Sequence, residues 1–166
     1  MTLTPTTSDS RQDFDFLFGS WRIDNRKIAD LLDPGCTEWV EFEAYGEARP
    51  VLGGLGNIDS FSAAAMPDGG AFEAMTLRLF DPGTGLWRIW WASSRAPGQL
   101  DTPVEGRFTD GHGQFFADDV INDRTVKVRF DWTHPTSNTA RWEQAFSYDG
   151  GNTWKLNWTM AFTRTD

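Results

Sequence analysis

Four polar side chains have the types and spacing for acid–base chemistry: Arg129, Arg141, Glu143 and Asn157. They fall on one face of three successive strands that we expect near 124–133, 139–148 and 153–164. If that face points inward, an Arg–Glu pair beside an amide can bind a carboxylate or polarise a carbonyl. If it points outward, the same residues form a ladder of salt bridges, each worth little.

The opposite face of these strands is the more apolar one, and strict alternation allows only one face inside. We therefore place that face in the interior and the charged ladder outside. One hairpin register, with Trp142 opposite Trp158, places the apolar side chains of the last two strands on one face and the polar ones on the other. The predicted interior carries Val126, Val128, Phe130, Trp132, Trp142, Phe146, Trp154, Leu156, Trp158, Met160 and Phe162.

Indole side chains on one face favour a binding cavity with aromatic walls. The polar groups expected to meet a ligand are Gln144, Arg88 and Arg164, with Arg88 in phase with Trp90 along its strand. The predicted ligand-binding residues are Arg88, Trp90, Phe130, Trp142, Gln144, Trp158 and Met160.

Other chemistry finds little support in the sequence. His112 lies in a Gly-flanked turn and His134 precedes Pro135, so both are expected at the rim, which disfavours haem. The nearby carboxylates, among them Asp118 and Asp119, match no dedicated metal loop. We expect neither a metal nor another cofactor.

A nucleotide site and a nucleophile are also disfavoured. The Gly53-Gly-Leu-Gly56 run lacks the lysine and the helix of a phosphate loop, so it is interpreted as a kink or bulge. Cys36 is the only cysteine and has no histidine near it in sequence. No catalytic residue is assigned.

Composition narrows the class of protein further. The formal charge of -9 arises from 24 acidic and 15 basic residues, which repels phosphate backbones and disfavours nucleic acid as a partner. The first residues, MTLTPTTSDSRQ, lack a secretory signal, and no run reaches transmembrane length. With its single thiol, the chain is expected in the cytoplasm, without a membrane partner.

The elements that position these residues are short β-strands. Aromatic and β-branched stretches alternate with Gly, Pro, Asp and Asn clusters, which predicts an antiparallel up-and-down meander. Helices are expected only at 11–19 and 28–36, both short. Ten strands would leave two long edges unless they close into a barrel, so the sequence predicts an all-β barrel domain at 13–166 behind a flexible tail at 1–12. The strands are expected at 18–28, 37–47, 51–62, 71–80, 85–94, 103–109, 113–120, 124–133, 139–148 and 153–164.

One strand, at 85–94, is apolar on both faces. Leu86, Trp90 and Ala92 alternate with Trp87, Ile89 and Trp91, so something must cover its outside. A homodimer through Trp87 and Trp91 is one hypothesis.

Two motifs have structural meanings. Gly19-Ser-Trp21 starts the first strand, where the glycine lets the chain cross a closed barrel end and the indole fills that end. Lipocalins pair such a Trp with an Arg late in the chain, which here is Arg164. Ser147-Tyr-Asp-Gly-Gly-Asn-Thr-Trp154 matches the Asp-box of sialidase propellers, in which the Asp ties down hairpin N–H groups. A single copy cannot form a propeller.

The chain resembles a family of small bacterial lipocalin-like (calycin-type) barrels without an assigned function. The resemblance is carried by Asp13-Phe-Asp-Phe-Leu-Phe-Gly-Ser-Trp21 and by the segment from Trp142-Glu-Gln-Ala-Phe-Ser147 to Asn157-Trp158. It implies a lipocalin-like barrel over nearly the whole chain and supplies no substrate.

Three functions remain open at this point. The first is a barrel that binds a small hydrophobic or amphipathic molecule. The second is a metal-independent isomerase, cyclase or decarboxylase that uses Arg141 and Glu143 inside the barrel. The third is a structural or interaction protein with a filled barrel.

Overall fold

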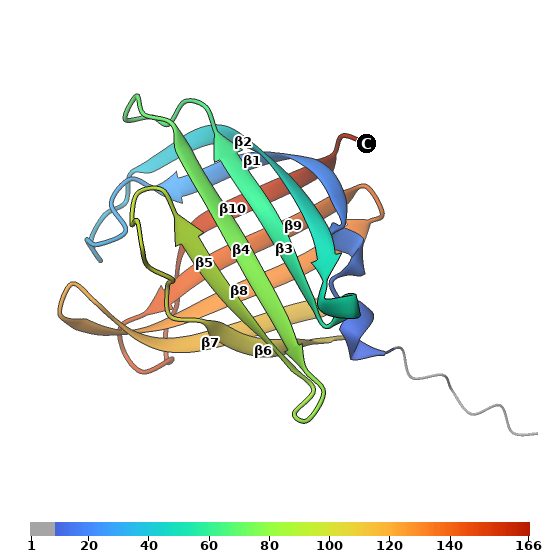
Figure 1. Cartoon of the computed structure of the whole chain (residues 1–166). Helices are drawn as coiled ribbons and strands as arrows, with labels where there is room; N and C mark the ends of the chain where they lie inside the picture. The colour runs from blue at the N-terminus through green and yellow to red at the C-terminus, as the bar shows by residue number, and fades with distance from the viewer. Residues whose placement is uncertain (1–8) are drawn as a thin grey trace, which may run out of the picture.

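In a computed structural model, which describes residues 9–166, ten antiparallel strands follow one another around a closed barrel (Figure 1). Each strand pairs with the next one in sequence, and β1 pairs with β10 to complete the circle. Closure leaves no sheet edge unpaired. The predicted all-β barrel is therefore confirmed. The strands are β1 (Gly19–Ile28), β2 (Trp39–Val51), β3 (Gly56–Ala63), β4 (Phe72–Asp81), β5 (Leu86–Ser93), β6 (Val104–Thr109), β7 (His112–Ile121), β8 (Arg124–Thr136), β9 (Thr139–Ser147) and β10 (Lys155–Arg164).

The helical content of the described residues is limited to three 3-10 turns: η1 (Ser10–Gln12), η2 (Asp15–Leu17) and η3 (Leu52–Gly54). The expected helix at 28–36 is wrong, because β1 runs to Ile28 and the residues after it form turns. The third strand begins later than expected, because η3 occupies the β2–β3 connection with Gly53 at φ 66°. No helix within residues 9–166 is long and apolar enough to cross a membrane.

The segment before β1 is attached to one end of the barrel. Phe14 is fully buried, and the indole Nε1 of Trp87 donates to the carbonyl oxygen of Ser10 at 3.2 Å. The expected boundary at residue 12 coincides with the end of η1, and residues 1–8 of the expected tail lie outside the described residues.

Trp21 and Arg164 lock the same end, as the Gly-x-Trp motif predicts. The Trp21 Nε1 donates to the Leu17 carbonyl at 2.7 Å, and the Arg164 guanidinium lies 4.2 Å from the centre of the Trp21 ring. Arg164 also donates to the carbonyl oxygens of Phe18, at 2.6 Å, and Phe16, at 2.8 Å. This end of the barrel is closed by side chains and by the N-terminal segment.

The Asp-box ties the β9–β10 hairpin, so its structural interpretation is confirmed. The Asp149 carboxylate accepts from the backbone N–H and the hydroxyl of Thr153, at 2.9 and 2.6 Å, and from the Ser147 hydroxyl at 2.8 Å. These hydrogen bonds hold the pKa of Asp149 at about 2.

A β-bulge changes the expected register of that hairpin. The pairing of β9 and β10 shifts between Leu156 and Trp158, so that Trp158 lies opposite Gln144, and Trp142 lies opposite Met160 rather than Trp158. The extra residue of the bulge reverses which side chains of β10 point inward in the part of the strand before it. Trp154 and Leu156, expected inside, are therefore outside: Leu156 is 36% exposed, and Trp154 lies against Arg129 at 4.7 Å.

The face of β5 that points into the barrel is the opposite of the one expected to carry ligand-binding residues. Trp87 and Ile89 are buried, and Trp91 lines the interior, whereas Arg88 and Trp90 point outward. The assignment of Trp87 and Trp91 to an external dimer surface is wrong, because Trp87 packs edge-on against Phe14 at 5.1 Å inside the barrel. Homodimerisation itself stays a prediction.

Candidate functional site: an interior cavity

A cavity of about 590 Å³ occupies the barrel interior. At one end it reaches the loops of residues 29–38, 64–71 and 94–103, where Leu32, Met66 and Leu100 line it. At the other end it meets Leu17 of the N-terminal segment and Trp21. This volume is in the range of pockets that hold drug-sized ligands.

Aromatic rings form one continuous wall of the cavity. Trp158 lies edge-on to both Trp91 and Trp142, with ring centres 6.0 and 5.6 Å apart, and Trp142 packs against Phe130 at 5.0 Å. Met160 lines the same wall. Flat, rigid rings present a large apolar surface at a low cost in side-chain entropy. The wall therefore suits a flat or extended apolar ligand.

Five of the seven predicted ligand-binding residues line this cavity: Phe130, Trp142, Gln144, Trp158 and Met160. The inward placement of Arg88 and Trp90 is wrong. Arg88 forms an ion pair with Glu105 at 2.6 Å on the outer surface, with a side chain 49% exposed. Trp90 pairs across the sheet with Leu77, which also lies on the outer face. Trp91, on the other face of the same strand, takes the place expected for Trp90.

The polar groups of the aromatic wall are mostly bonded to each other. Gln144 Nε2 donates to Asn157 Oδ1 at 3.0 Å, and Trp158 Nε1 donates to Asn25 Oδ1 at 3.0 Å. Asn157, expected on the outer ladder, is buried because the bulge turns it inward. These pairs fix ring and amide orientations in the cavity wall.

A second polar cluster near the closed end has no counterpart in the sequence predictions. Arg78 is 2% exposed and points inward from β4. Its Nη2 lies 2.7 Å from Asp59 Oδ2, and its Nη1 donates to Asn57 Oδ1 at 2.9 Å. The guanidinium also lies 5.1 Å from the ring centre of Phe14 and 5.5 Å from that of Trp132.

This cluster contains three buried N–H groups that find no protein acceptor. They are Asn57 Nδ2, Arg78 Nε and Trp132 Nε1. An unpaired buried donor costs about 1–3 kcal/mol, so three in one cluster are unusual in a folded interior. Arg78, Asp59 and Trp132 all line the cavity.

Charged groups also line the open end. Burial lowers the pKa of the Lys27 ammonium, and the nearby Arg95 guanidinium lowers it further. Lys27 Nζ lies 5.3 Å from the centre of the Trp158 ring. Burial raises the pKa of the Asp101 carboxyl, and the Asp119 carboxylate adds to this rise. Both signs of charge thus flank the mouth, where a polar end of a ligand would lie.

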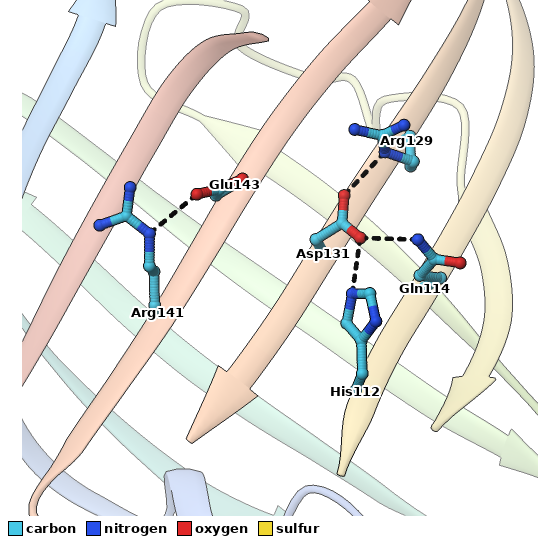
Figure 2. A network of polar contacts seen from close by, with 6 residues as sticks. All are labelled: His112, Gln114, Arg129, Asp131, Arg141 and Glu143. Atoms are coloured by element: carbon cyan, nitrogen blue, oxygen red, sulfur yellow. Dashed lines mark hydrogen bonds and ion pairs between the residues drawn. The ribbon is translucent and has the colours of Figure 1, made fainter. Parts of the chain in front are cut away.

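The candidate acid–base residues lie on the outer face of the barrel. Figure 2 shows two separate groups there: Arg141 with Glu143, and Asp131 with its three donors. Arg141 Nε donates to Glu143 Oε1 at 2.8 Å, and the Arg141 side chain is 48% exposed. Asp131 accepts from Arg129 Nε at 2.7 Å. The outward placement of Arg129, Arg141 and Glu143 is confirmed, although their ion pairs run within single strands and Asn157 is not part of the group. The alternative of Arg141 and Glu143 inside the barrel is wrong.

The histidines and the cysteine lie away from the cavity. His112 Nε2 lies 2.7 Å from Asp131 Oδ1 on the outer face, and the His134 ring stacks on Phe16 at 4.2 Å. Cys36 lies in the loop after β1, and its thiol contacts the Glu38 carbonyl at 3.8 Å. Among residues 9–166, no three His, Cys, Asp or Glu side chains are grouped so that they could hold a metal ion.

Fold and cavity together define a closed ten-strand antiparallel barrel of lipocalin-like type with an interior cavity that opens at one end. No family model and no curated protein matches the sequence. Among solved structures, the S-type phycobiliprotein lyase CPES from Guillardia theta is similar, with a TM-score of 0.62 and 12% identity over 96% of this chain and 94% of that chain. A redesigned β-barrel matches with a TM-score of 0.50 and 11% identity over 96% of this chain and 100% of the other. At these identities the likeness shows the fold alone.

Proposed function

We propose that this protein binds a small amphipathic molecule inside its barrel. The observation that carries the proposal is the 590 Å³ cavity, which combines an aromatic wall with polar clusters at both ends. A barrel that served only as a scaffold would be expected to fill its interior with side chains. The aromatic wall supplies apolar contact, and the end clusters select the orientation of the ligand.

The arrangement of polar groups favours binding over catalysis. The Arg141–Glu143 pair, the basis of the enzyme alternative, is on the outer surface. In the wall, the polar side chains Gln144 and Asn157 are neutral amides bonded to each other, so they supply neither an acid nor a base. The phycobiliprotein lyase of similar fold does not define the ligand, because the likeness extends only to the fold.

Native mass spectrometry of the freshly purified protein, compared with the mass of the denatured chain, is the first test. We expect a reproducible additional mass, which would give the ligand class and the oligomeric state in one measurement. Because Trp91, Trp142 and Trp158 all line the cavity, ligand titration is also expected to change Trp fluorescence.

A matched pair of variants tests the location of binding. Ala48 lines the cavity, so Ala48→Phe would fill part of the space and is expected to weaken binding of any ligand found. Ala161→Phe makes the same change on the outward face of β10, where the residue is exposed, and is expected to leave binding intact. Equal binding by both variants and the wild type would place the ligand outside the barrel and contradict the proposal.

A further inference from the structure

We infer that the closed end of the cavity recognises a neutral carbonyl oxygen on the ligand, through the unpaired N–H groups of Arg78 and Trp132. This inference rests on the proposed function and adds the chemistry of one end of the ligand. Its starting point is that both side chains line the cavity while Arg78 Nε and Trp132 Nε1 lack a protein acceptor.

The missing partner must be a hydrogen-bond acceptor. An indole N–H and a guanidinium N–H can only donate, and so can the amide nitrogen of Asn57 that completes the set. The Asn57 oxygen already accepts from Arg78 Nη1, which fixes its amide with the nitrogen turned away from that bond. A ligand hydroxyl or amine hydrogen would add a further donor to a site in which donors are already in excess.

The charge balance of the cluster selects a neutral acceptor over a carboxylate. The Arg78 charge is already compensated by Asp59, whose Oδ2 lies 2.7 Å from Arg78 Nη2. The two side chains are 3% and 17% exposed, so their charges are poorly screened by water. A ligand carboxylate would bring a second negative charge beside Asp59 into a region of low dielectric, which is unfavourable. A ketone, amide or ester oxygen accepts the same N–H groups without that cost.

The surroundings of the cluster determine how a ligand oxygen can reach its unpaired donors. The guanidinium lies beside the rings of Phe14 and Trp132, with ring centres at 5.1 and 5.5 Å, and its Nη atoms are bonded to Asp59 and Asn57, so it has little freedom to turn. The unpaired N–H groups are covered by neighbouring atoms. Binding therefore includes a small movement of the Trp132 ring that exposes them to the oxygen.

Three naphthalene probes of similar shape separate these possibilities by isothermal titration calorimetry. They are 2-acetylnaphthalene, with a neutral carbonyl, 2-ethylnaphthalene, with no acceptor, and 2-naphthoate, with a carboxylate. We expect the ketone to bind about tenfold more tightly than the hydrocarbon, which corresponds to about 1.4 kcal/mol from the two N–H groups together. We expect naphthoate to bind no better than the hydrocarbon.

Trp132→Phe is the sharpest variant, because it removes the Nε1–H and keeps an aromatic ring, and that N–H has no protein partner to lose. We expect the affinity ratio of ketone to hydrocarbon to fall about threefold, because Arg78 Nε remains as a donor to the oxygen. Trp90→Phe is the matched control: it makes the same change on the outer face of β5, away from the cavity and the unpaired donors, and is expected to leave the ratio unchanged. In the wild type, the indole ¹⁵N–¹H resonance of Trp132 is expected to move with the ketone and not with the hydrocarbon.

The outcomes distinguish the inference from the proposed function. Tighter binding of naphthoate, or equal binding of ketone and hydrocarbon with a stationary Trp132 resonance, would overturn the inference while leaving a binding barrel in place. Failure of all three probes and of native mass spectrometry to show any ligand would overturn the proposed function, and the inference with it.

Discussion

Replacing Arg164 with methionine is expected to loosen the closed end of the barrel. The guanidinium donates to three carbonyl oxygens, those of Phe16, Phe18 and Ser137, at 2.8, 2.6 and 3.1 Å, and lies over the Trp21 ring. Methionine keeps much of the apolar stem and removes every donor. Taking about 1 kcal/mol for each hydrogen bond and about 1 kcal/mol for the cation–π contact gives about 4 kcal/mol. The side chain is 20% exposed, which lowers our expectation to about 3 kcal/mol because water screens and replaces part of each interaction.

Urea unfolding followed by Trp fluorescence measures this loss as a change in the free energy of unfolding. Arg141→Met is the matched control, since it removes an exposed ion pair from the outer face and is expected to cost about 0.5 kcal/mol or less. A loss for Arg164→Met as small as that of the control would refute the reasoning. It would mean that the N-terminal segment is held by its buried apolar side chains and its bonds to Trp21 and Trp87, without the arginine.

Three further predictions concern single residues. Gly19 has φ 111°, and a Cβ there would lie 2.6 Å from Arg164 Nη1, so Gly19→Ala is expected to lower the free energy of unfolding by about 1–3 kcal/mol in the same assay. The pKa of Asp149 is lowered to about 2, so its carboxylate contributes stability above the unfolded pKa near 3.8, and this stability is lost as the pH falls toward 2. In thermal melts between pH 5 and 2, the melting temperature of Asp149→Asn is therefore expected to fall less steeply than that of the wild type. Lys27 has a lowered pKa, so burying its charged ammonium destabilises the fold below that pKa, and this cost is relieved as the pH rises toward 10.5. Lys27→Met is therefore expected to raise the melting temperature at pH 7. An unchanged or lower melting temperature would contradict this.

Local chemistry explains why the strand order could be predicted from the sequence. The turns contain residues that accept a left-handed backbone: Asp110 and Gly111 have φ 51° and 79°, and Gly150 and Gly151 have φ 75° and 96°. Such turns join adjacent antiparallel strands, so a chain that repeats them is restricted to a meander. Closure then follows from the number of strands and the lack of a covering helix.

The facing of β5 depends on a contact that the sequence pattern does not contain. Both faces of the strand are apolar, so periodicity alone cannot choose between Trp90 and Trp91. The choice is made by Phe14, which comes from a segment more than 70 residues earlier and packs on Trp87 inside the barrel. Once Trp87 points inward, alternation places Trp91 inside and Trp90 outside.

The bulge in β10 is a second feature that the alternating sequence pattern does not predict. A period of two predicts Trp154, Leu156 and Trp158 on one face. The extra residue at Asn157 breaks that period, and the buried Asn157 amide is satisfied by Gln144. A polar residue between two apolar ones is the available signal of such a break, but it also fits an ordinary outward position.

Arg78 was missed because the pattern of β4 is the reverse of a usual barrel strand. Met75, Leu77 and Leu79 alternate with Thr76 and Arg78, which by hydrophobicity alone predicts the arginine outside. In the structure Thr76 and Arg78 point inward, and Met75 is 38% exposed.

The reversal of β4 has a cost in hydrophobic burial, and the neighbouring strand shows what offsets part of it. The cross-strand partner of Arg78 on β3 is Asn57, and Asp59, two residues further along, faces the same way, so β3 supplies both an amide and a carboxylate to the guanidinium. Such a buried pair is often no more stable than apolar side chains of the same volume. Its unpaired donors add a further cost. A charged cluster that stability alone does not favour, placed against a cavity, is consistent with selection for a ligand, and this is the reason to test Arg78 and Trp132 before the residues of the aromatic wall.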